Sequence, residues 1–409
     1  MMHGERVLLS EGSSLTARET LTVLGRRGVQ VEIVSASSAP IARFSRWCRR
    51  LHHAPAPATD PIGYLAGVDA LMSTGRFTAL IPTHEQAWLF AAGRRLLPHA
   101  RVAVADIGAF GQLESKVRFA RLLDHLALPQ PAWAEVQQES DLDRLGFPVW
   151  VKAAFSTAGR GVRHVHNHRE AVSAWHALRS PDNPVMVQQS APGRYRQVQA
   201  IFDHGRLVAA AVSEQLATGV GGSAAARLSV GDPVAVDAIR RVGEHLDWHG
   251  GIDLDFFSSQ GQPQFIECNP RTVEPGNAAA AGVNLPQLLV DLATGAPLPH
   301  QPVIARAGVR TRSTMAIGLG AAESPGTRRA IGGALLRAVA RRGPLRGSVE
   351  VLTPVLHDPP SIIPLLVTVP RVLANPRAVE HLAGRSVGAY AVGASAVAVA
   401  SAAAAGQSG

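Results

Sequence analysis

The first 110 residues alternate between short apolar runs and helical patterns. The apolar runs predict strands at residues 6–10, 29–35, 79–83 and 101–105. Helical spacing between them predicts helices at 14–27 and 84–96. Because strands separated by helices usually pair in parallel, this pattern predicts a doubly wound parallel α/β sheet. No Gly-x-Gly-x-x-Gly follows the first run, which argues against a dinucleotide site.

The chain is long enough for about two or three domains. Apolar residues make up 46% of its 409 residues, which excludes a disordered or collagenous protein. The two cysteines, Cys48 and Cys268, lie too far apart in the sequence to suggest a disulfide framework or a cysteine zinc site. The N-terminus does not resemble a secretory signal. We therefore expect a cytoplasmic protein.

The net charge of +9 is concentrated in one segment. Residues 301–350 hold nine arginines and two acidic residues, whereas the rest of the chain is nearly neutral. Aromatic residues make up only 5% of the chain, and we find no helix-turn-helix, zinc-finger or RNA-binding aromatic motif. The sequence therefore does not predict nucleic-acid binding.

Lysine is scarce in this chain. Thirty-eight of the forty basic residues are arginine, and only Lys116 and Lys152 are lysine. They either persist by chance at the surface or mark places where a compact ammonium group is needed and a planar guanidinium does not fit.

Lys152 ends an apolar strand and is followed by a loop of small residues. The loop contains Gly159, Arg160 and Gly161, and a second strand follows it. Small residues let backbone N–H groups approach an anion, and a neighbouring lysine neutralises phosphate. Taken alone, the segment is equally consistent with an ordinary glycine hairpin.

Two further hairpins follow. Residues 197–214 predict antiparallel strands that turn at His204–Gly205, and residues 250–271 predict another such pair. Glu267 and Asn269 lie two apart on a strand and share one face, which Asp255 on the partner strand can reach.

These two carboxylates and the amide oxygen form a hard donor set suited to Mg²⁺. Arg271 continues the alternation and adds an anion-binding group beside the metal site. The alternative, a solvated polar strand face, fits less well because the strand's opposite face is apolar.

Together these segments resemble the ATP-grasp superfamily, which includes biotin carboxylase, carbamoyl phosphate synthetase and D-alanine–D-alanine ligase. The resemblance covers about 79–290, with a preceding domain like the family's in 1–110. Four stretches match in order and spacing: SKVRFARLLDHLALPQP, FPVWVKAAFSTAGRGV, VMVQQSAPG and DFFSSQGQPQFIECNPR. Both lysines fall on the family's two ATP-contacting lysine positions.

The resemblance implies an α/β chain in four parts. A pre-ATP-grasp domain over 1–112 carries the doubly wound parallel sheet. An ATP-grasp domain over 113–305 contains a lid, at about 147–193, and an antiparallel-sheet ATP-binding subdomain. A basic C-terminal extension over 306–385 and an uncharged, alanine-rich tail over 386–409 follow.

The resemblance also implies the roles of the site residues. Lys116 and Lys152 contact ATP, and the lid loop that covers its phosphates includes Ser156, Gly159, Arg160 and Gly161. Gln188 and Gln189 lie on the segment that binds adenine. Two Mg²⁺ ions, with Mn²⁺ as a substitute, are held by Asp255, Glu267 and Asn269. Arg271 and Lys152 act in catalysis, and Arg271 faces the acyl phosphate or the acceptor.

Three positions depart from the family. The family often has glutamate where this chain has Asp255, and the acid usual at the ribose contact is replaced by Gln197 or Gln199. Glu274 is either a base or, as we favour, a carboxylate on the rim of the site.

The implied activity is an ATP-dependent ligase. It activates a small carboxylate as an acyl phosphate, joins it to an amine and releases ADP. Alternatives are a carboxyphosphate-using carboxylase, a carbamoyl-phosphate-type enzyme and an inactive nucleotide-binding regulator. Expected partners are the two small-molecule substrates and a second copy of the chain in a homodimer. The sequence does not identify either substrate.

Other patterns allow simpler readings. His164, His166 and His168 alternate and either form a metal site or, as we favour, line an exposed edge of the lid.

Residues 327–343 predict a basic helix with an apolar stripe: Ile331, Leu335, Leu336 and Val339. We expect this stripe to pack on the ATP-grasp core rather than the helix to bind a membrane surface. The tail from Ser386 predicts a mobile segment or a surface helix rather than a membrane span, with a disordered end.

Overall fold

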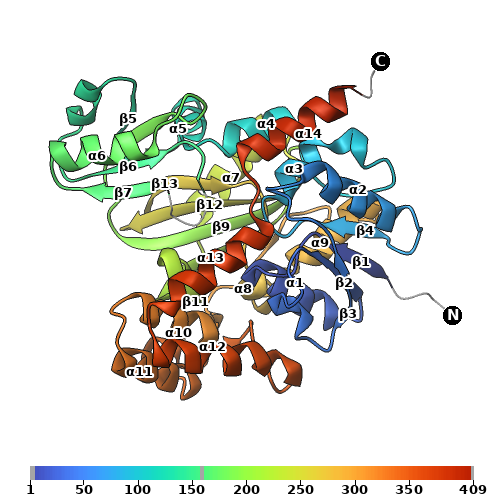
Figure 1. The fold of residues 1–409 in the computed structure, drawn as a ribbon. Coiled ribbons are helices and arrows are strands. Elements are labelled where there is room, and N and C mark those ends of the chain that lie inside the picture. Colours follow the sequence, from blue (N-terminus) through green and yellow to red (C-terminus); the bar gives the residue numbers. More distant parts are fainter. Residues whose placement is uncertain (1–4, 157–160, 407–409) are drawn as a thin grey trace.

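The computed structural model describes residues 5–156 and 161–406 of the chain (Figure 1). Three sheets follow one another along the sequence. A parallel sheet comes first, a small antiparallel sheet second and a large antiparallel sheet third, and helices from the C-terminal region then pack beside them.

The parallel sheet lies in the N-terminal domain. Its strands are ordered β3 (Cys48–His53), β2 (Gln30–Ser35), β1 (Arg6–Leu9) and β4 (Ala79–Ile81). One face packs against α2 (Pro61–Met72) and α3 (Gln86–Ala92), and the other packs against α1 (Leu15–Gly25) and α9 (Leu285–Thr294). Ser14 caps α1 by accepting a hydrogen bond from the Ala17 N–H at 3.0 Å. The predicted doubly wound sheet is confirmed.

Two details of this sheet differ from the sequence prediction. Residues 101–105 form no strand, although the Leu80 N–H donates to the Arg101 carbonyl at 2.8 Å. Residues 48–53 instead supply the strand β3 at the edge of the sheet. This strand reads CRRLHH and carries little apolar alternation, because an edge strand need not bury both faces.

The second sheet forms a small layer of its own. Its strands are ordered β5 (Trp133–Val136), β8 (Val185–Gln188), β6 (Val149–Ala153) and β7 (Val162–Val165). Helix α6 (His168–Leu178) covers one face through Trp175 and Ala171. Helix α5 (Lys116–His125) packs near this layer through Val117 and Ala120.

The third sheet carries the two predicted hairpins. Its order is β13 (Gln262–Asn269), β12 (Gly250–Ser259), β9 (Arg194–Asp203), β10 (Arg206–Thr218), β11 (Ala224–Ser229), β15 (Arg310–Arg312) and β16 (Val349–Glu350), with β14 (Val303–Ile304) beside β10. His204 and Gly205 both have positive φ, as the predicted two-residue turn requires. Helices α7 (Pro233–His245) and α8 (Gly276–Ala280) also contact this sheet.

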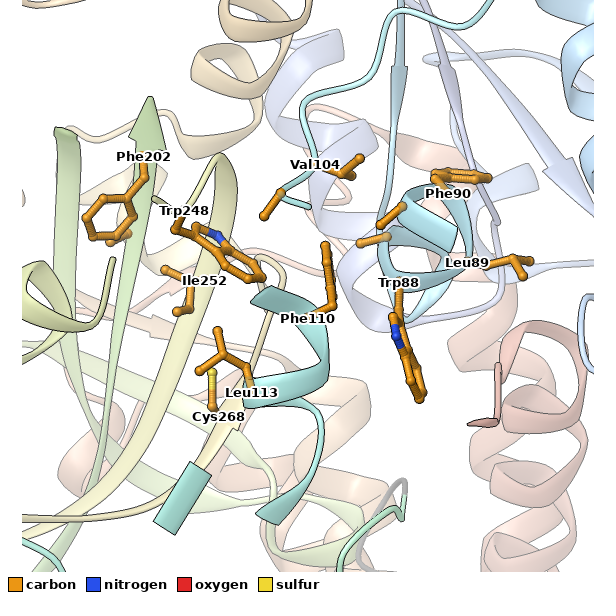
Figure 2. Packing of buried hydrophobic residues seen from close by; sticks show 14 of the residues in the cluster. Trp88, Leu89, Phe90, Val104, Phe110, Leu113, Phe202, Trp248, Ile252 and Cys268 are labelled. Carbon is orange, nitrogen blue, oxygen red and sulfur yellow. The ribbon is translucent and has the colours of Figure 1, made fainter. Parts of the chain in front are cut away.

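An aromatic core joins the N-terminal domain to the large sheet. The rings of Phe110, on α4 (Ile107–Leu113), and Trp248 lie 4.9 Å apart, and Figure 2 shows them between the sheet and α3. Close contact between the two parts also depends on Gly250, which has a φ of 110°. A Cβ there would lie 2.7 Å from the Ala103 carbonyl oxygen. The core therefore fixes the parallel sheet relative to the large sheet.

The basic helix of the C-terminal region packs through other residues than predicted. Helix α11 (Arg328–Val339) contacts α10 (Thr314–Glu323) and α12 (Ile362–Ala374), and its Ala334 and Ala338 share a hydrophobic cluster with two alanines of β11 in the large sheet. Its buried face consists of Ile331, Ala334 and Ala338, whereas Leu336 and Val339 are 65% and 67% exposed. The expected stripe is therefore partly correct: Ile331 is buried and Leu335 packs beside it, whereas alanines replace Leu336 and Val339 on the buried face because small side chains allow close helix approach.

The uncharged tail is helical. Helices α13 (Ala378–Tyr390) and α14 (Ala394–Gly406) are separated by a short break, and α14 contacts α3 and α2 of the N-terminal domain. Residues 378–406 are long and apolar enough to cross a membrane by length and composition alone, and 39% of their most apolar window is buried inside the molecule. The tail thus matches the surface-helix alternative, with one face buried.

Candidate active site

The predicted metal ligands meet on one face of the large sheet. Asp255 lies directly opposite Glu267, and the Asn269 side chain donates to Asp255 Oδ2 at 3.0 Å. The other face of these strands buries Leu254 and Cys268 in the main core. Strand alternation therefore gathers the polar groups at the surface that faces the small sheet and the N-terminal domain.

Lys116 contacts this face from the first turn of α5. Ser115 caps the helix, and Lys116 Nζ lies 2.8 Å from Glu267 Oε1 and 3.3 Å from Ser156 Oγ. The lysine side chain is buried. Burial opposes the negative charge of Glu267. The positive charges of Lys116 and Lys152 outweigh this effect and hold the pKa of Glu267 below its usual range.

Lys152 approaches from the small sheet. Its ammonium group donates to Gln188 Oε1 at 2.6 Å, and the side chain is buried. Burial lowers the pKa of Lys152 to about 8, even though the carboxylate of Glu267 favours the charged form. Two ammonium groups that are distant in sequence thus converge on one carboxylate.

Asp255 is held by a residue that the sequence reading did not single out. The Tyr195 hydroxyl, on β9, donates to Asp255 Oδ1 at 2.5 Å. Burial, followed by the negative charge of Glu267, raises the pKa of Asp255 to about 6. Tyr195 lies on the strand that pairs with β12, so its role depends on a pairing that the sequence alone does not reveal.

Asp253 is the second residue that the sequence reading missed. It is completely buried, and neither of its carboxylate oxygens accepts a hydrogen bond of normal geometry. Burial and the neighbouring Asp255 raise its pKa well above the usual range. The pattern Ile-Asp-Leu-Asp places Asp253 on the same face as Asp255, and this alternation was the available signal.

This donor set fits a divalent cation. Asp255, Glu267 and Asn269 supply hard oxygen atoms, and the unpartnered carboxylate of Asp253 lies opposite Asn269 in the strand register. A buried carboxylate without a partner is costly, and a nearby cation would reduce that cost.

Arg271 lies beside this set but already has an anionic partner. It donates to Asn269 Oδ1 at 2.9 Å, and its other terminal nitrogen lies 3.2 Å from Glu85 Oε1. His84 Nδ1 lies 2.6 Å from the second oxygen of Glu85. Burial opposes the negative charge of Glu85, but His84 and Arg271 outweigh this effect and lower the pKa of Glu85 to about 2. The N-terminal domain therefore holds this guanidinium in place.

The glutamines near the predicted nucleotide site lie in two places. Gln188 is bound to Lys152, whereas Gln189 is exposed and donates to the Leu145 carbonyl at 3.3 Å. Gln197 and Gln199 lie opposite Asp255 and Asp253 in the register, and the Gln199 amide donates to the Val273 carbonyl. The adenine and ribose roles of these residues stay predictions.

Glu274 is not a free carboxylate on the rim. It lies 3.0 Å from Arg227 on β11, and the two side chains are 15% and 8% exposed. Arg227 also donates to Gln197, so it links Glu274 to the polar face of β9. Glu274 is therefore paired with a guanidinium of β11, and its place at the rim of the site stays a prediction.

The lid loop is described only in part. Gly159 and Arg160 lie outside the described residues, whereas Ser156 and Gly161 lie within them. A Cβ at Gly161 would lie 2.3 Å from the Ser156 Cβ, so this position requires glycine. Ser156 lies beside Lys116, and its role in covering the phosphates stays a prediction.

Within the described residues, the three alternating histidines do not bring their ring nitrogens together as one group of metal donors. The His164 ring lies 4.5 Å from the ring of Trp150, and His168 pairs with Asp143 at 3.0 Å. Within residues 5–156 and 161–406, the only group of close histidine and carboxylate donors consists of Asp203, His204 and His249, at the opposite end of β9.

The sequence matches known proteins over its central part. Residues 113–275 match a family described as the ATP-grasp domain. The multifunctional protein URA2 of Saccharomyces cerevisiae is 28% identical over 207 residues, which cover 46% of this chain and 9% of URA2. The carbamoyl phosphate synthase large chain of Pyrococcus furiosus is 23% identical over 43% of this chain and 18% of its own length. The chain thus spans less than a fifth of these relatives.

Solved structures share the fold over a larger part of the chain. Carboxyaminoimidazole ribonucleotide synthase from Aspergillus clavatus, solved with ATP, has a TM-score of 0.63 at 15% identity and covers 91% of this chain and 100% of its own. Biotin carboxylase from Campylobacter jejuni has a TM-score of 0.59 at 16% identity, and the match covers 73% of this chain and 72% of the carboxylase. L-amino acid ligase from Bacillus licheniformis has a TM-score of 0.54 at 15% identity, and the match covers 72% of this chain and 75% of the ligase.

Proposed function

Because residues 113–275 form an ATP-grasp domain, we propose that this protein is an ATP-dependent ligase. It activates a small carboxylate as an acyl phosphate, joins that carboxylate to an amine, and releases ADP and phosphate. The observation that carries this proposal is the convergence of Lys116 and Lys152 on the polar face that bears Asp255 and Glu267.

The two lysines bind the triphosphate. Both ammonium groups are buried, so their attraction for phosphate is weakly screened. Lys152 carries its charge at pH 7, because its lowered pKa of about 8 still lies above neutrality. When the substrate carboxylate attacks the γ-phosphate, these fixed charges stabilise the transferring phosphoryl group.

The carboxylate face holds the metal. Asp255, Glu267 and Asn269 are the proposed ligands of two Mg²⁺ ions, for which Mn²⁺ can substitute. Asp253 lies behind them, where a bound cation would favour its ionised form. The bound metal would neutralise charge on the triphosphate. Lys116 contacts one oxygen of Glu267, and Tyr195 holds Asp255 in place.

Arg271 binds the acyl phosphate. Glu85 orients its guanidinium from the N-terminal domain, while Asn269 fixes its other terminal nitrogen. A planar guanidinium held on both sides presents its remaining N–H groups in a fixed direction, as recognition of a phosphate requires.

A second candidate function uses bicarbonate as the acid. It is favoured by the similarity to carbamoyl phosphate synthase and to carboxyaminoimidazole ribonucleotide synthase. An inactive regulator is disfavoured, because a protein that only binds a nucleotide does not need a set of carboxylates next to the two lysines that bind the triphosphate. Bicarbonate-dependent release of ADP separates this second candidate from the ligase.

The proposed setting is the cytoplasm, and the proposed assembly is a homodimer. The biotin carboxylase domain of the Hydrogenobacter thermophilus 2-oxoglutarate carboxylase, which has a TM-score of 0.58 to this chain, is described as a dimer. Light scattering of the purified protein tests the assembly, with a monomer mass contradicting it.

An ADP-release screen tests the ligase proposal. Purified protein is incubated with Mg-ATP and pairs of amino acids or small carboxylates, in buffers with and without bicarbonate. We expect ADP release that needs both an acid and an amine, and mass spectrometry should show an amide product. Release that needs bicarbonate alone would favour the second candidate, and no magnesium-dependent nucleotide binding would contradict both.

A further inference from the structure

A strap formed by residues 378–406 links two distant parts of the molecule. We use this name for α13, the break after Tyr390 and α14. Helix α13 contacts α10 and α12 of the C-terminal helices, whereas α14 contacts α3 and α2 of the N-terminal domain. Figure 1 shows the two red helices crossing the middle of the molecule from one part to the other.

The strap crosses the N-terminal domain where its parallel strands end. Ser386 donates to the carbonyl of Ser13, in the loop after β1, at 2.9 Å. Gln86, which follows β4, donates to the carbonyl of Tyr390. In open α/β sheets, ligands bind outside the carboxyl ends of the strands. The strap therefore covers the edge of the sheet where a substrate is expected.

Tyr390 is connected to the proposed catalytic arginine through two residues. Its ring lies 4.3 Å from the ring of His84. His84 binds Glu85 at 2.6 Å, and Glu85 binds Arg271 at 3.2 Å. Tyr390 thus stands at the end of a continuous set of contacts that leads to the polar face of the large sheet.

The hydrophobic core anchors this tyrosine. Tyr390 is 8% exposed, and the side chains that follow it, Val392, Ala396, Val397 and Ala400, belong to the main core. A mobile tail would place no side chain reproducibly, whereas packing on both sides fixes the position of Tyr390.

Carboxylates lie near the hydroxyl of Tyr390. Burial raises the pKa of Tyr390, and the charges of Glu11, Glu85 and Glu274 add to this effect, whereas Arg271 opposes it. Negative charge that disfavours a phenolate favours a cation at the same place. Aromatic rings also bind ammonium groups over their faces.

We propose that Tyr390 and the strap form one wall of the pocket for the amine substrate, which enters as a cationic ammonium. Tyr390 contacts this substrate, and the size of its ring decides which amines reach the acyl phosphate at Arg271. This inference rests on the proposed ligase function and assigns a role to the C-terminal tail, which lies outside the residues that match the ATP-grasp domain.

Substitutions at Tyr390 test this inference in the full-length chain. Tyr390→Ala removes the ring, Tyr390→Phe keeps it and Tyr390→Trp enlarges it. Val399→Ala is the matched control, because Val399 lies on α14 and is 50% exposed. ADP release is measured at saturating Mg-ATP with ammonium, glycine, L-lysine and putrescine as amines. Binding of Mg-AMPPNP is measured by calorimetry.

We expect Tyr390→Ala to raise the KM for the amine by about tenfold, with kcat and Mg-AMPPNP affinity changed less than about twofold. Tyr390→Phe and Val399→Ala should behave like the unsubstituted protein, and Tyr390→Trp should shift preference towards smaller amines. If Tyr390→Ala does not fold, the Phe and Trp variants still decide the question.

Each remaining outcome counts against a specific claim. An unchanged amine profile in the Ala and Trp variants would overturn the strap inference and leave the ligase proposal standing. Turnover only with uncharged acceptors would overturn the ammonium assignment. Failure of the unsubstituted protein to bind Mg-AMPPNP would instead contradict the proposed function.

Discussion

Single charged side chains dominate the candidate site. Lys116, Lys152, Asp253, Asp255 and Glu267 are drawn together by strands and helices that each bury an apolar face elsewhere. Bringing like charges close is unfavourable, and the shifted pKa values of the carboxylates record this cost. Such sites are stabilised when a ligand of complementary charge binds.

Nucleotide affinity should fall as the pH rises above about 8. Lys152 is charged below its pKa of about 8 and neutral above it, so alkaline pH removes one positive charge from the triphosphate site. We expect the Kd for Mg-AMPPNP to rise by up to about tenfold per pH unit above that value. Calorimetry between pH 6.5 and 9.5 checks this expectation, and Lys152→Gln should abolish this part of the pH dependence.

Glu267→Gln should abolish ATP turnover. The substitution keeps the shape of the side chain but removes the charge that pairs with Lys116 at 2.8 Å and would bind the metal. We expect a loss of at least about 100-fold in kcat. Glu244→Gln, at a half-exposed position on α7, is the control. Full turnover in the Glu267 variant would count against the metal assignment.

Asp253→Asn should stabilise the protein without ligands. Asp253 is buried and, within the described residues, accepts no hydrogen bond of normal geometry. The folded protein therefore disfavours its ionised form, which the unfolded chain adopts freely, and this difference costs free energy of folding. The folded-state pKa is raised, and this cost therefore grows as the pH rises. We expect an increase of about 1 kcal/mol or more in the free energy of unfolding at pH 8, with a smaller gain at pH 5.

Urea unfolding at the two pH values measures the effect of this substitution. In the same variant, added Mg²⁺ and AMPPNP should stabilise the protein less than they stabilise the unsubstituted chain. Equal stabilisation of both proteins would show that Asp253 does not contribute to cation binding.

At the scale of elements, local sequence patterns predicted whether a segment forms a helix or a strand better than they predicted which element it packs against. The hairpins around His204–Gly205 and in residues 250–271 were predicted correctly, because turn residues and alternation are local signals. The segment 101–105 is as apolar as a strand, yet it forms none, although the Leu80 N–H of β4 donates to its Arg101 carbonyl. For α11, the sequence indicated a helix but not which of two apolar faces would be covered.

Gly250→Ala should destabilise the contact between β12 and the N-terminal domain. A Cβ at this position would lie 2.7 Å from the Ala103 carbonyl oxygen, and the φ of 110° is unfavourable for any other residue. We expect a loss of about 2 kcal/mol or more in the free energy of unfolding. Gly231→Ala, where no atom lies within 4 Å of the added Cβ, should change stability little in the same urea titration.

At the scale of the whole molecule, the C-terminal tail holds the N-terminal and C-terminal parts together. Ala400 on α14 is completely buried in the core that also contains Trp88 and Phe90, whereas the adjacent Val399 is half exposed. The tail is apolar because it packs on protein, and alanine suits close helix contacts.

Ala400→Arg should therefore destabilise the protein strongly, whereas Val399→Arg should not. An arginine at a fully buried alanine position requires both a cavity and a partner for its charge, and the expected loss is at least about 3 kcal/mol. Thermal unfolding of the purified full-length variants checks this difference. Similar melting temperatures for both variants would show that α14 does not pack on the N-terminal domain.

The sequence by itself determined the type of most elements and the chemistry of the site. Alternation and turn residues act over a few positions, so most strands and the shared face of Glu267 and Asn269 could be predicted from the sequence. The domain boundaries and the ligand roles of these residues stay predictions.

Only the tertiary structure decided which side chains complete the site. Glu85 reaches Arg271 across 186 positions, and Tyr390 reaches His84 from the far end of the chain. Such pairs depend on how whole layers pack, and no local periodicity encodes that packing. For the same reason, the contacts of Tyr195 and Arg227 with the site depend on strand pairing and could not be predicted from the sequence.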